Sequence, residues 1–255
     1  MIIETRSLSK SFGAVAAVRD VSMIVQQGEL RGIVGANGAG KSTLFGLIAG
    51  QLAPDHGQIR FRDRDITALP PHRRAGLRIA IVFQAARLFR GMTALENVMV
   101  GAHAVFRHGF TEAMLYLPRH VREERAIRQR AEQALDRVGL ADRAGVAAES
   151  LPIGQQRMLQ VARALCGEPD LLLLDEPASG LRASERRALS DLLAGLKPSG
   201  LTMMLVEHDV AFVNGLADKI TVLDLGAVIA EGSPAEVWSD RRVVAAYLGE
   251  EAASA

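Results

Sequence analysis

The chain of 255 residues is 49% hydrophobic, so it is long and apolar enough to bury a substantial core, and we expect a single domain. Its 30 basic and 29 acidic side chains give a formal net charge of +1, which excludes a whole-molecule field that would attract nucleic acid or anionic lipid. With one cysteine, Cys166, the chain cannot form an internal disulfide. The N-terminus lacks the layout of a signal peptide, which favours a cytosolic protein. No run approaches the roughly 18 apolar residues of a membrane span, so we expect any membrane role to be peripheral.

The first predicted strands cover residues 21–25 and 30–34, which are short β-branched runs bounded by Gly28 and by a glycine cluster. A helix follows the cluster, because Leu44, Leu47 and Ile48 recur at helical spacing. The local order is therefore strand, glycine loop, helix. Later apolar runs predict further strands, and the helical patterns between them favour a mostly parallel sheet: residues 79–83, 171–174, 201–206 and 220–223.

The glycine loop fits the G-x-x-x-x-G-K-[ST] pattern in the strand and helix context that this motif requires. Its glycines let successive N–H groups point at phosphate oxygens, and the following helix adds its positive N-terminal end. Lys41 would bridge the β- and γ-phosphates, and Ser42 would bind Mg²⁺. The alternative, a plain glycine-rich turn, is weakened because the required lysine is one of only four in a chain with 26 arginines. The expected phosphate-binding residues are Gly35, Asn37, Gly38, Ala39, Gly40, Lys41, Ser42 and Thr43.

Residues 111–138 predict a helical lobe set into the sheet domain. Five apolar residues form one stripe, and arginine and glutamate fill the other positions. The arginines could bind phosphate, but the glutamates among them favour a solvated helix face. The stripe consists of Ile127, Ala131, Ala134, Leu135 and Val138, and the arginines are Arg119, Arg122, Arg125, Arg128 and Arg130.

Residues 171–177 read LLLLDEP, a strand too apolar to be exposed, followed by Asp175 and Glu176 at its carboxyl end. Ligands of open α/β sheets gather at that edge. Alone, two acids in this place are equally well explained as a helix cap. With the phosphate loop present, we expect Asp175 to hold Mg²⁺, commonly through water, and Glu176 to polarise a water for attack on the γ-phosphate.

With these motifs the chain resembles the ATPase subunits of ABC transporters, essentially from end to end. The resemblance implies an α/β fold of the P-loop NTPase type, an ABC ATPase cassette with a mostly parallel core sheet, an antiparallel β region and an inserted helical subdomain. It implies one nucleotide-binding domain over residues 1–250, with a RecA-like core at about 1–88 and 160–232 and a helical lobe at about 89–159. Residues 251–255 would be a tail.

The resemblance assigns roles to three further residues. Gln84, at the end of IVFQ, matches the glutamine that contacts Mg²⁺ and the attacking water and faces the membrane subunit. His208, in LVEHD, matches the switch histidine that holds the γ-phosphate. Phe12 occupies the place of the aromatic residue that stacks on adenine, where tyrosine is more usual. Taken singly, such residues are more often surface, structural or core residues, and their order around the motifs carries the assignment.

The segment SLPIGQQR aligns with the family signature, usually written LSGGQ. In the family this segment contacts the γ-phosphate bound by the opposite subunit, which implies that hydrolysis needs a dimer. Gly154 opens a helix with an apolar stripe, so its backbone N–H groups point at an anion. The residues implied to face the partner's ATP are Leu151, Pro152, Ile153, Gly154 and Gln155.

Two departures from the family pattern fall at the implied dimer interface. Pro152 replaces the signature serine, so a hydroxyl and a backbone N–H are lost. Arg182 stands where the loop after LLLLDEP usually ends in an acidic or amide residue. Because both lie outside this chain's own phosphate loop, we expect an asymmetric dimer with a different partner ATPase.

Longer phrases, such as ARLFRGMTALENVMVGAH and the stretch from VEHDV to SPAEV, resemble the ATPases of branched-chain amino acid importers, whose relatives carry urea and short amides. This resemblance implies ATP and Mg²⁺ as cofactors and a peripheral place on the cytoplasmic side of the membrane. The implied partners are a second ATPase subunit, two transmembrane permease subunits and, indirectly, a periplasmic or extracellular solute-binding protein, without nucleic acid. Leucine, another amino acid and urea all stay open as the cargo.

Other ATP- and GTP-binding proteins share some of these motifs. An exporter ATPase stays open, because its cassette is much the same and fold does not fix function. Chromosomal ABC ATPases need a long coiled coil and ribosomal ones need two tandem cassettes, and the sequence shows neither. A GTP switch would need an Asn-Lys-x-Asp element for guanine, which the sequence also lacks.

Overall fold

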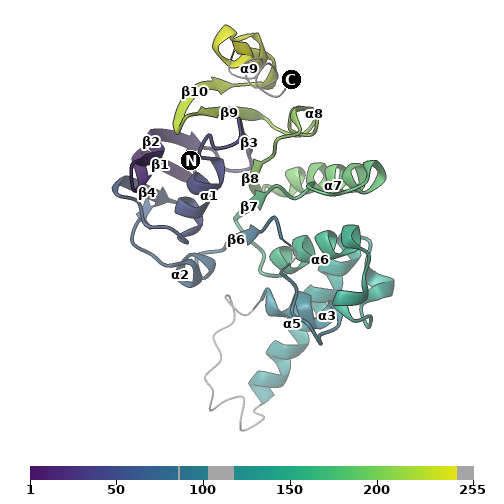
Figure 1. The fold of residues 1–255 in the computed structure, drawn as a ribbon. Helices are drawn as coiled ribbons and strands as arrows, with labels where there is room; N and C mark the ends of the chain where they lie inside the picture. The colour runs from purple at the N-terminus through teal and green to yellow at the C-terminus, as the bar shows by residue number, and fades with distance from the viewer. Residues whose placement is uncertain (86, 103–117, 246–255) are drawn as a thin grey trace.

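The computed structural model describes residues 1–85, 87–102 and 118–245. Its core is a six-stranded sheet in the order β10-β9-β3-β8-β7-β6 (Figure 1). All neighbours are parallel except β9 and β10, so the predicted, mostly parallel sheet is confirmed. The strands are β3 (Leu30–Gly35), β6 (Ile79–Val82), β7 (Leu171–Asp175), β8 (Thr202–Val206), β9 (Lys219–Asp224) and β10 (Ala227–Gly232).

A second, antiparallel sheet of four strands lies beside the core sheet, in the order β2-β1-β4-β5 (Figure 1). It forms the antiparallel region that the resemblance implied. The strand expected at residues 21–25 is the second half of a longer strand, because the chain turns back on itself as a hairpin after Phe12. The strands are β1 (Ile3–Phe12), β2 (Val15–Val25), β4 (His56–Phe61) and β5 (Arg64–Asp65).

Helices α3, α5 and α6 pack together as a lobe at one end of the core sheet (Figure 1). The apolar stripe predicted for residues 111–138 is buried throughout. Arg128 and Glu132 on the other face are exposed, as a solvated face predicts. The start of that segment and the side chain of Arg119 lie outside the described residues, as does the predicted tail. The lobe helices are α3 (Ala94–Val100), α5 (Pro118–Arg137) and α6 (Ile153–Cys166).

The remaining helices flank the two sheets. Among the described residues, no helix combines the length and the apolar character needed to cross a membrane. These helices are α1 (Lys41–Ala49), α2 (Pro71–Ala75), α7 (Ala183–Leu196), α8 (Val210–Asn214) and α9 (Pro234–Ser239), with short 3-10 turns at Ala141–Arg143, Ala148–Ser150 and Lys197–Ser199.

Strand β7 separates two apolar clusters. Leu172 and Leu174 pack in a cluster with the helical lobe, whereas Leu171 and Leu173 pack in a cluster with α1 and the antiparallel sheet. Successive side chains of a strand point to opposite faces, so a strand covered on both faces needs apolar residues at every position. This explains the unbroken leucine run before Asp175.

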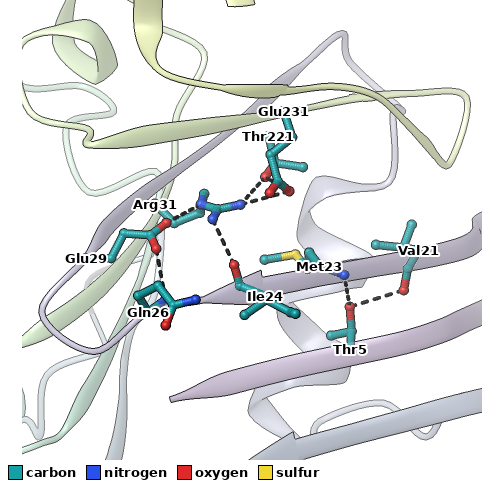
Figure 2. A network of polar contacts seen from close by, with 9 residues as sticks. All are labelled: Thr5, Val21, Met23, Ile24, Gln26, Glu29, Arg31, Thr221 and Glu231. Carbon is teal, nitrogen blue, oxygen red and sulfur yellow. Dashed lines mark hydrogen bonds and ion pairs between the residues drawn. The ribbon is translucent and has the colours of Figure 1, made fainter. Parts of the chain in front are cut away.

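A buried arginine joins the two sheets (Figure 2). Arg31 of β3 is fully buried, and its guanidinium bonds to Glu29 at 2.5 Å, to the hydroxyl of Thr221 at 2.9 Å and to the carbonyl of Ile24 at 2.9 Å. Glu231 forms an ion pair with it at 2.9 Å. A buried charge with a missing partner destabilises strongly, so this fully paired group fixes β2 against β9 and β10.

A second buried arginine holds the end of α1. Arg74 donates to the carbonyls of Leu47 and Ile48 at 2.7 and 2.6 Å, and to those of Leu69 and Thr67 at 2.8 and 3.0 Å. The last carbonyls of a helix have no partner within the helix, and Arg74 supplies one. Burial lowers the pKa of Arg74 to about 10. The helix that follows the phosphate loop is therefore fixed at its far end.

Candidate functional site

The glycine loop joins the end of β3 to the start of α1, as the sequence predicts. Gly40 has a φ of 98°, and a Cβ there would collide with the carbonyl of Ala17, so only glycine fits. Beside the loop lies a cavity of about 190 Å³. Its lining combines the loop, one residue of β2 and the second acid of LLLLDEP: Ala17, Asn37, Gly38, Ala39, Gly40, Lys41, Ser42, Thr43 and Glu176.

The side chain of Lys41 is buried and turns back over the loop. Its Nζ donates to the carbonyls of Gly35 at 2.6 Å and of Ala36 at 2.8 Å. An ammonium group is a compact donor on a flexible stem, suited to phosphate oxygens. The lysine thus lines the cavity while its ammonium group bonds to carbonyls of the loop.

Asp175 and Glu176 follow β7 at the same edge of the sheet. Burial, and then the negative charge of Glu176, raise the pKa of Asp175, while the positive charge of Lys41 opposes the rise. Glu176 adopts a φ of 46°, and its N–H donates to the carbonyl of Val206 at 2.9 Å. The amide of Gln84 donates to the Glu176 carboxylate at 2.6 Å. The structure therefore brings Gln84, Glu176 and the phosphate loop together.

His208 lies just beyond β8, with 62% of its side chain exposed. Its Nδ1 is 3.8 Å from the carboxylate of Glu207, whose own side chain is 1% exposed. Glu207 accepts the backbone N–H of Ala178 at 2.8 Å, and burial raises the pKa of its carboxyl. Glu207 thus ties the loop after Glu176 to the loop that carries His208. Sequence reasoning missed it, although a carboxyl group directly after a buried strand was a usable signal.

Phe12 lies at the end of β1 and is half exposed, with the ammonium of Lys10 5.7 Å from its ring centroid. It pairs with Val15 across the hairpin, and Ala17 of the same hairpin lines the cavity. Phe12 itself does not line that cavity. A half-exposed ring in the hairpin that also lines the cavity could stack against a flat ligand.

The signature segment forms the start of α6, away from the cavity of the phosphate loop. Pro152 is the residue before the helix and gives no side-chain cap. Gly154 is buried, and a Cβ there would collide with the carboxylate of Glu185. Glu185 also accepts the N–H of Arg182 at 2.9 Å, which joins the exposed Arg182 to this surface. Of the remaining residues, Leu151 is buried, Ile153 is 62% exposed and Gln155 is half-buried.

The candidate metal ligands are an oxygen set. Among the residues that the structure describes, no group of three or more His, Cys, Asp or Glu could hold a metal ion. Mg²⁺ needs fewer protein ligands, because it keeps waters and binds substrate phosphates together with one or two carboxylates. Ser42, Gln84 and Asp175 offer a hydroxyl, an amide oxygen and a carboxylate. Partial burial raises the pKa of Asp175, so a nearby cation would stabilise its charged form. The residues present therefore fit Mg²⁺.

Comparison with known proteins shows the family of this chain. The family model described as ABC transporter matches residues 18–179, which is more than half of the chain. The chain belongs to this family. A second model, for the branched-chain amino acid ATP-binding cassette transporter, matches residues 227–253 of this ABC cassette.

Curated relatives match this ABC cassette along its length. The high-affinity branched-chain amino acid transport ATP-binding protein LivG of Escherichia coli strain K12 is 36% identical over 250 residues, or 98% of both chains. The corresponding BraF of Pseudomonas aeruginosa is 37% identical over the same shares. The lipopolysaccharide export system ATP-binding protein LptB of Acidithiobacillus ferridurans is 34% identical over 250 residues.

Solved structures confirm the predicted α/β cassette fold. A nucleotide-free ATP-binding cassette from an ABC transporter is 30% identical, with a TM-score of 0.83 over 96% of this chain and 98% of that one. The cassette MJ0796, a dimer in a post-hydrolysis state with ADP and Pi, is 26% identical, with a TM-score of 0.77 over 91% and 99%.

Proposed function

We propose that this ABC cassette binds ATP with Mg²⁺ and hydrolyses it to drive an importer. The observation that carries the proposal is the shared cavity, in which Lys41 and Ser42 of the phosphate loop face the same space as Glu176. Gln84 bonds directly to the Glu176 carboxylate. A phosphate-binding loop and a candidate base with its hydrogen-bond partner are thus found in one place.

Binding would use the loop and the rim. The N–H groups of the loop from Gly35 to Thr43 would cradle the phosphates, helped by the N-terminal end of α1. Lys41 would exchange its bonds to the loop carbonyls for bonds to the β- and γ-phosphates. Phe12 would stack on adenine from the rim.

Hydrolysis would use the residues at the carboxyl edge of the sheet. Mg²⁺, held by Ser42, Asp175 and Gln84, would neutralise charge on the phosphate oxygens. Glu176 would orient a water and take its proton as the water oxygen attacks the γ-phosphorus, while the bond to the β-phosphate oxygen breaks and ADP and phosphate form. His208, which is exposed at this edge, would hold the γ-phosphate.

The partner ATPase would complete the site. The signature residues lie at a surface away from this chain's own cavity, which suits contact with ATP on another subunit. The MJ0796 cassette is a dimer in its solved structure. We propose that the partner here is a different ATPase chain, since Pro152 and Arg182 both change this surface.

The permease would bind beside α6. A cavity of about 340 Å³ lies between α1, α2, β6 and α6, with Ala75, Phe83 and Ala164 among its lining residues. Phe83 directly precedes Gln84, so a permease helix seated here would contact the segment that reaches Glu176. We propose that this places the cassette on the cytoplasmic side of the membrane, with a solute-binding protein as an indirect partner.

The domain division stays part of this proposal. Residues 1–250 would form one nucleotide-binding domain, with the helical lobe at about 89–159, the core on either side of it and a tail at 251–255. Helix α6 crosses residue 160, so it would belong to both the lobe and the core.

Branched-chain amino acids are the proposed cargo, because the names of LivG and BraF carry that assignment and residues 227–253 match the model of the same subfamily. The likeness to LptB, an export protein, extends over the cassette as well. It is the weaker alternative, since it lacks the support of the C-terminal match.

The test is hydrolysis of Mg²⁺-ATP by the purified chain, alone and mixed with candidate second ATPase subunits. Glu176→Gln is the control, because it keeps the hydrogen-bonding shape but cannot take a proton. Strong stimulation by one partner, reduced by Glu176→Gln to the rate of the partner's own site, is the expected result. Full activity of the chain alone as a symmetric dimer would contradict the proposed asymmetric pair, and wild-type hydrolysis by Glu176→Gln would contradict the proposed base.

A further inference from the structure

The segment that carries Gln84 is held by side chains of α6. Pairing between β6 and β7 ends at Val82, so the following carbonyls have no strand partner. Such carbonyls can bond to hydrogen-bond donors from elsewhere in the chain. Three residues of α6 provide them: Arg157 donates to Phe83 O at 3.2 Å, Gln160 to Ala85 O at 3.0 Å and Arg163 to Arg87 O at 2.6 Å.

The spacing of these contacts is regular. The donors stand three residues apart on α6, which places them on one helix face. Their acceptors are alternate carbonyls of the segment that follows β6. Gln84 lies between the first two contacts, and its own amide reaches Glu176. The α6 contacts therefore hold the backbone on both sides of Gln84, the residue that bonds to the candidate base Glu176.

These donors are costly for stability, which argues for another role. Gln160 is 2% exposed, and its Oε1 has no hydrogen-bond partner among the described residues. An unpaired buried amide oxygen destabilises a fold, so an apolar side chain of the same shape would serve packing better. Burial also lowers the pKa of Arg157 and of Arg163, which shows that both charges are partly desolvated.

We propose that Gln160, together with Arg157 and Arg163, positions Gln84 against Glu176. The inference rests on the proposed function, in which Gln84 acts in hydrolysis. Because α6 begins at the signature surface around Gly154, the same helix links contact with the partner subunit to the geometry of this chain's own site. These are positioning residues, since none of them contacts the cavity of the phosphate loop.

The test variant is Gln160→Met, which keeps the length of the side chain and removes both the donor and the unpaired oxygen. Gln129→Met is the matched control, because Gln129 is an exposed glutamine of α5. We expect the thermal midpoint of Gln160→Met to equal or exceed that of the wild type. In the assembled transporter we expect kcat to fall about fivefold, the size of one lost hydrogen bond, with KM for ATP unchanged.

A double-mutant cycle with Gln84→Ala separates positioning from general damage. If Gln160 acts through Gln84, Gln160→Met lowers hydrolysis in the wild-type background and not in the Gln84→Ala background. If the fold-decrease in hydrolysis of the double variant equals the product of the two single fold-decreases, the two residues act independently and the inference is overturned.

Hydrogen exchange of the full chain gives a reading that needs no catalysis. The peptide containing Gln84 should exchange faster in Gln160→Met than in the wild type or Gln129→Met, and unchanged exchange there would overturn the inference. If Gln84→Ala alone hydrolyses ATP normally, the role proposed for Gln84 is wrong, while the exchange experiment still decides whether α6 fixes the segment.

Discussion

Glu207 offers a sharp test of how the loops around Glu176 and His208 are held. Its carboxyl is buried, accepts the N–H of Ala178 at 2.8 Å and has Glu176, His208 and Arg157 as ionisable neighbours. Glu207→Gln keeps an oxygen acceptor for that N–H, whereas Glu207→Leu leaves the N–H unpaired. We expect Glu207→Leu to lose about 1–3 kcal/mol of unfolding free energy, or roughly 2–4 °C per kcal/mol in thermal midpoint.

The pH dependence of this pair of variants follows from the raised pKa of Glu207. The contribution of a group with a raised folded-state pKa is fully present below the unfolded pKa, near 4.5, and is lost as pH rises through the folded pKa. The glutamine of Glu207→Gln does not ionise, so this variant does not lose stability in that way. Its unfolding free energy relative to the wild type should therefore increase between pH 4 and pH 7. Urea unfolding of the three proteins at both pH values is the assay. Equal unfolding free energies of the Gln and Leu variants would refute the reasoning. A difference in unfolding free energy between the Gln variant and the wild type that is the same at both pH values would also refute it.

The remaining predictions concern residues with separate tasks. Lys41→Ala should weaken nucleotide binding by at least about tenfold, measured by titration with Mg²⁺-ATP, because the only ammonium among the cavity-lining residues is removed. His208→Ala should leave nucleotide binding intact and slow turnover about a hundredfold, and loss of binding instead would make His208 a structural residue. Arg74→Met should lower the unfolding free energy by about 3–5 kcal/mol, because four carbonyls at the end of α1 and nearby lose a charged donor, and a loss under 1 kcal/mol would contradict the capping role.

The positions and roles of the phosphate loop and of LLLLDEP could be predicted, because each pattern indicates both a local structure and a kind of chemistry. Gly40 is required where a Cβ would strike another strand, and the leucine run is required where a strand is covered on both faces. Such constraints act on neighbouring residues, so a short window of sequence contains them. The strands expected at residues 30–34, 171–174 and 201–206 accordingly end within a residue or so of the observed ones.

Strands β1, β4 and β5 and the buried arginines could not be predicted in this way. Strand β1 is a polar, irregular stretch that owes its form to pairing with β2 and β4 on either side. Arg31 bonds to Thr221, which is 190 residues away, so nothing near Arg31 distinguishes it from the exposed arginines. The three donors of α6 share this property, because their acceptors lie about seventy-five residues earlier.

Pro152 has a consequence for how the two sites of the proposed dimer would differ. Pro152 is the residue before α6, with a ψ of 152°, so the N–H groups of the first helical turn stay in place. Compared with a serine at this position, only the side-chain hydroxyl and the backbone N–H of residue 152 are lost. The partner's ATP would then meet a weaker set of donors, while this chain's ATP would meet whatever signature the partner carries. Since Lys41, Glu176 and Gln84 are all present here, we expect the site built on this chain's phosphate loop to be the faster one when the partner signature contains serine. Pro152→Ser should therefore raise ATP turnover only at the partner's phosphate loop. This rate can be measured when hydrolysis at this chain's own site is disabled by Glu176→Gln. An unchanged rate would mean that the missing hydroxyl does not limit the partner's site.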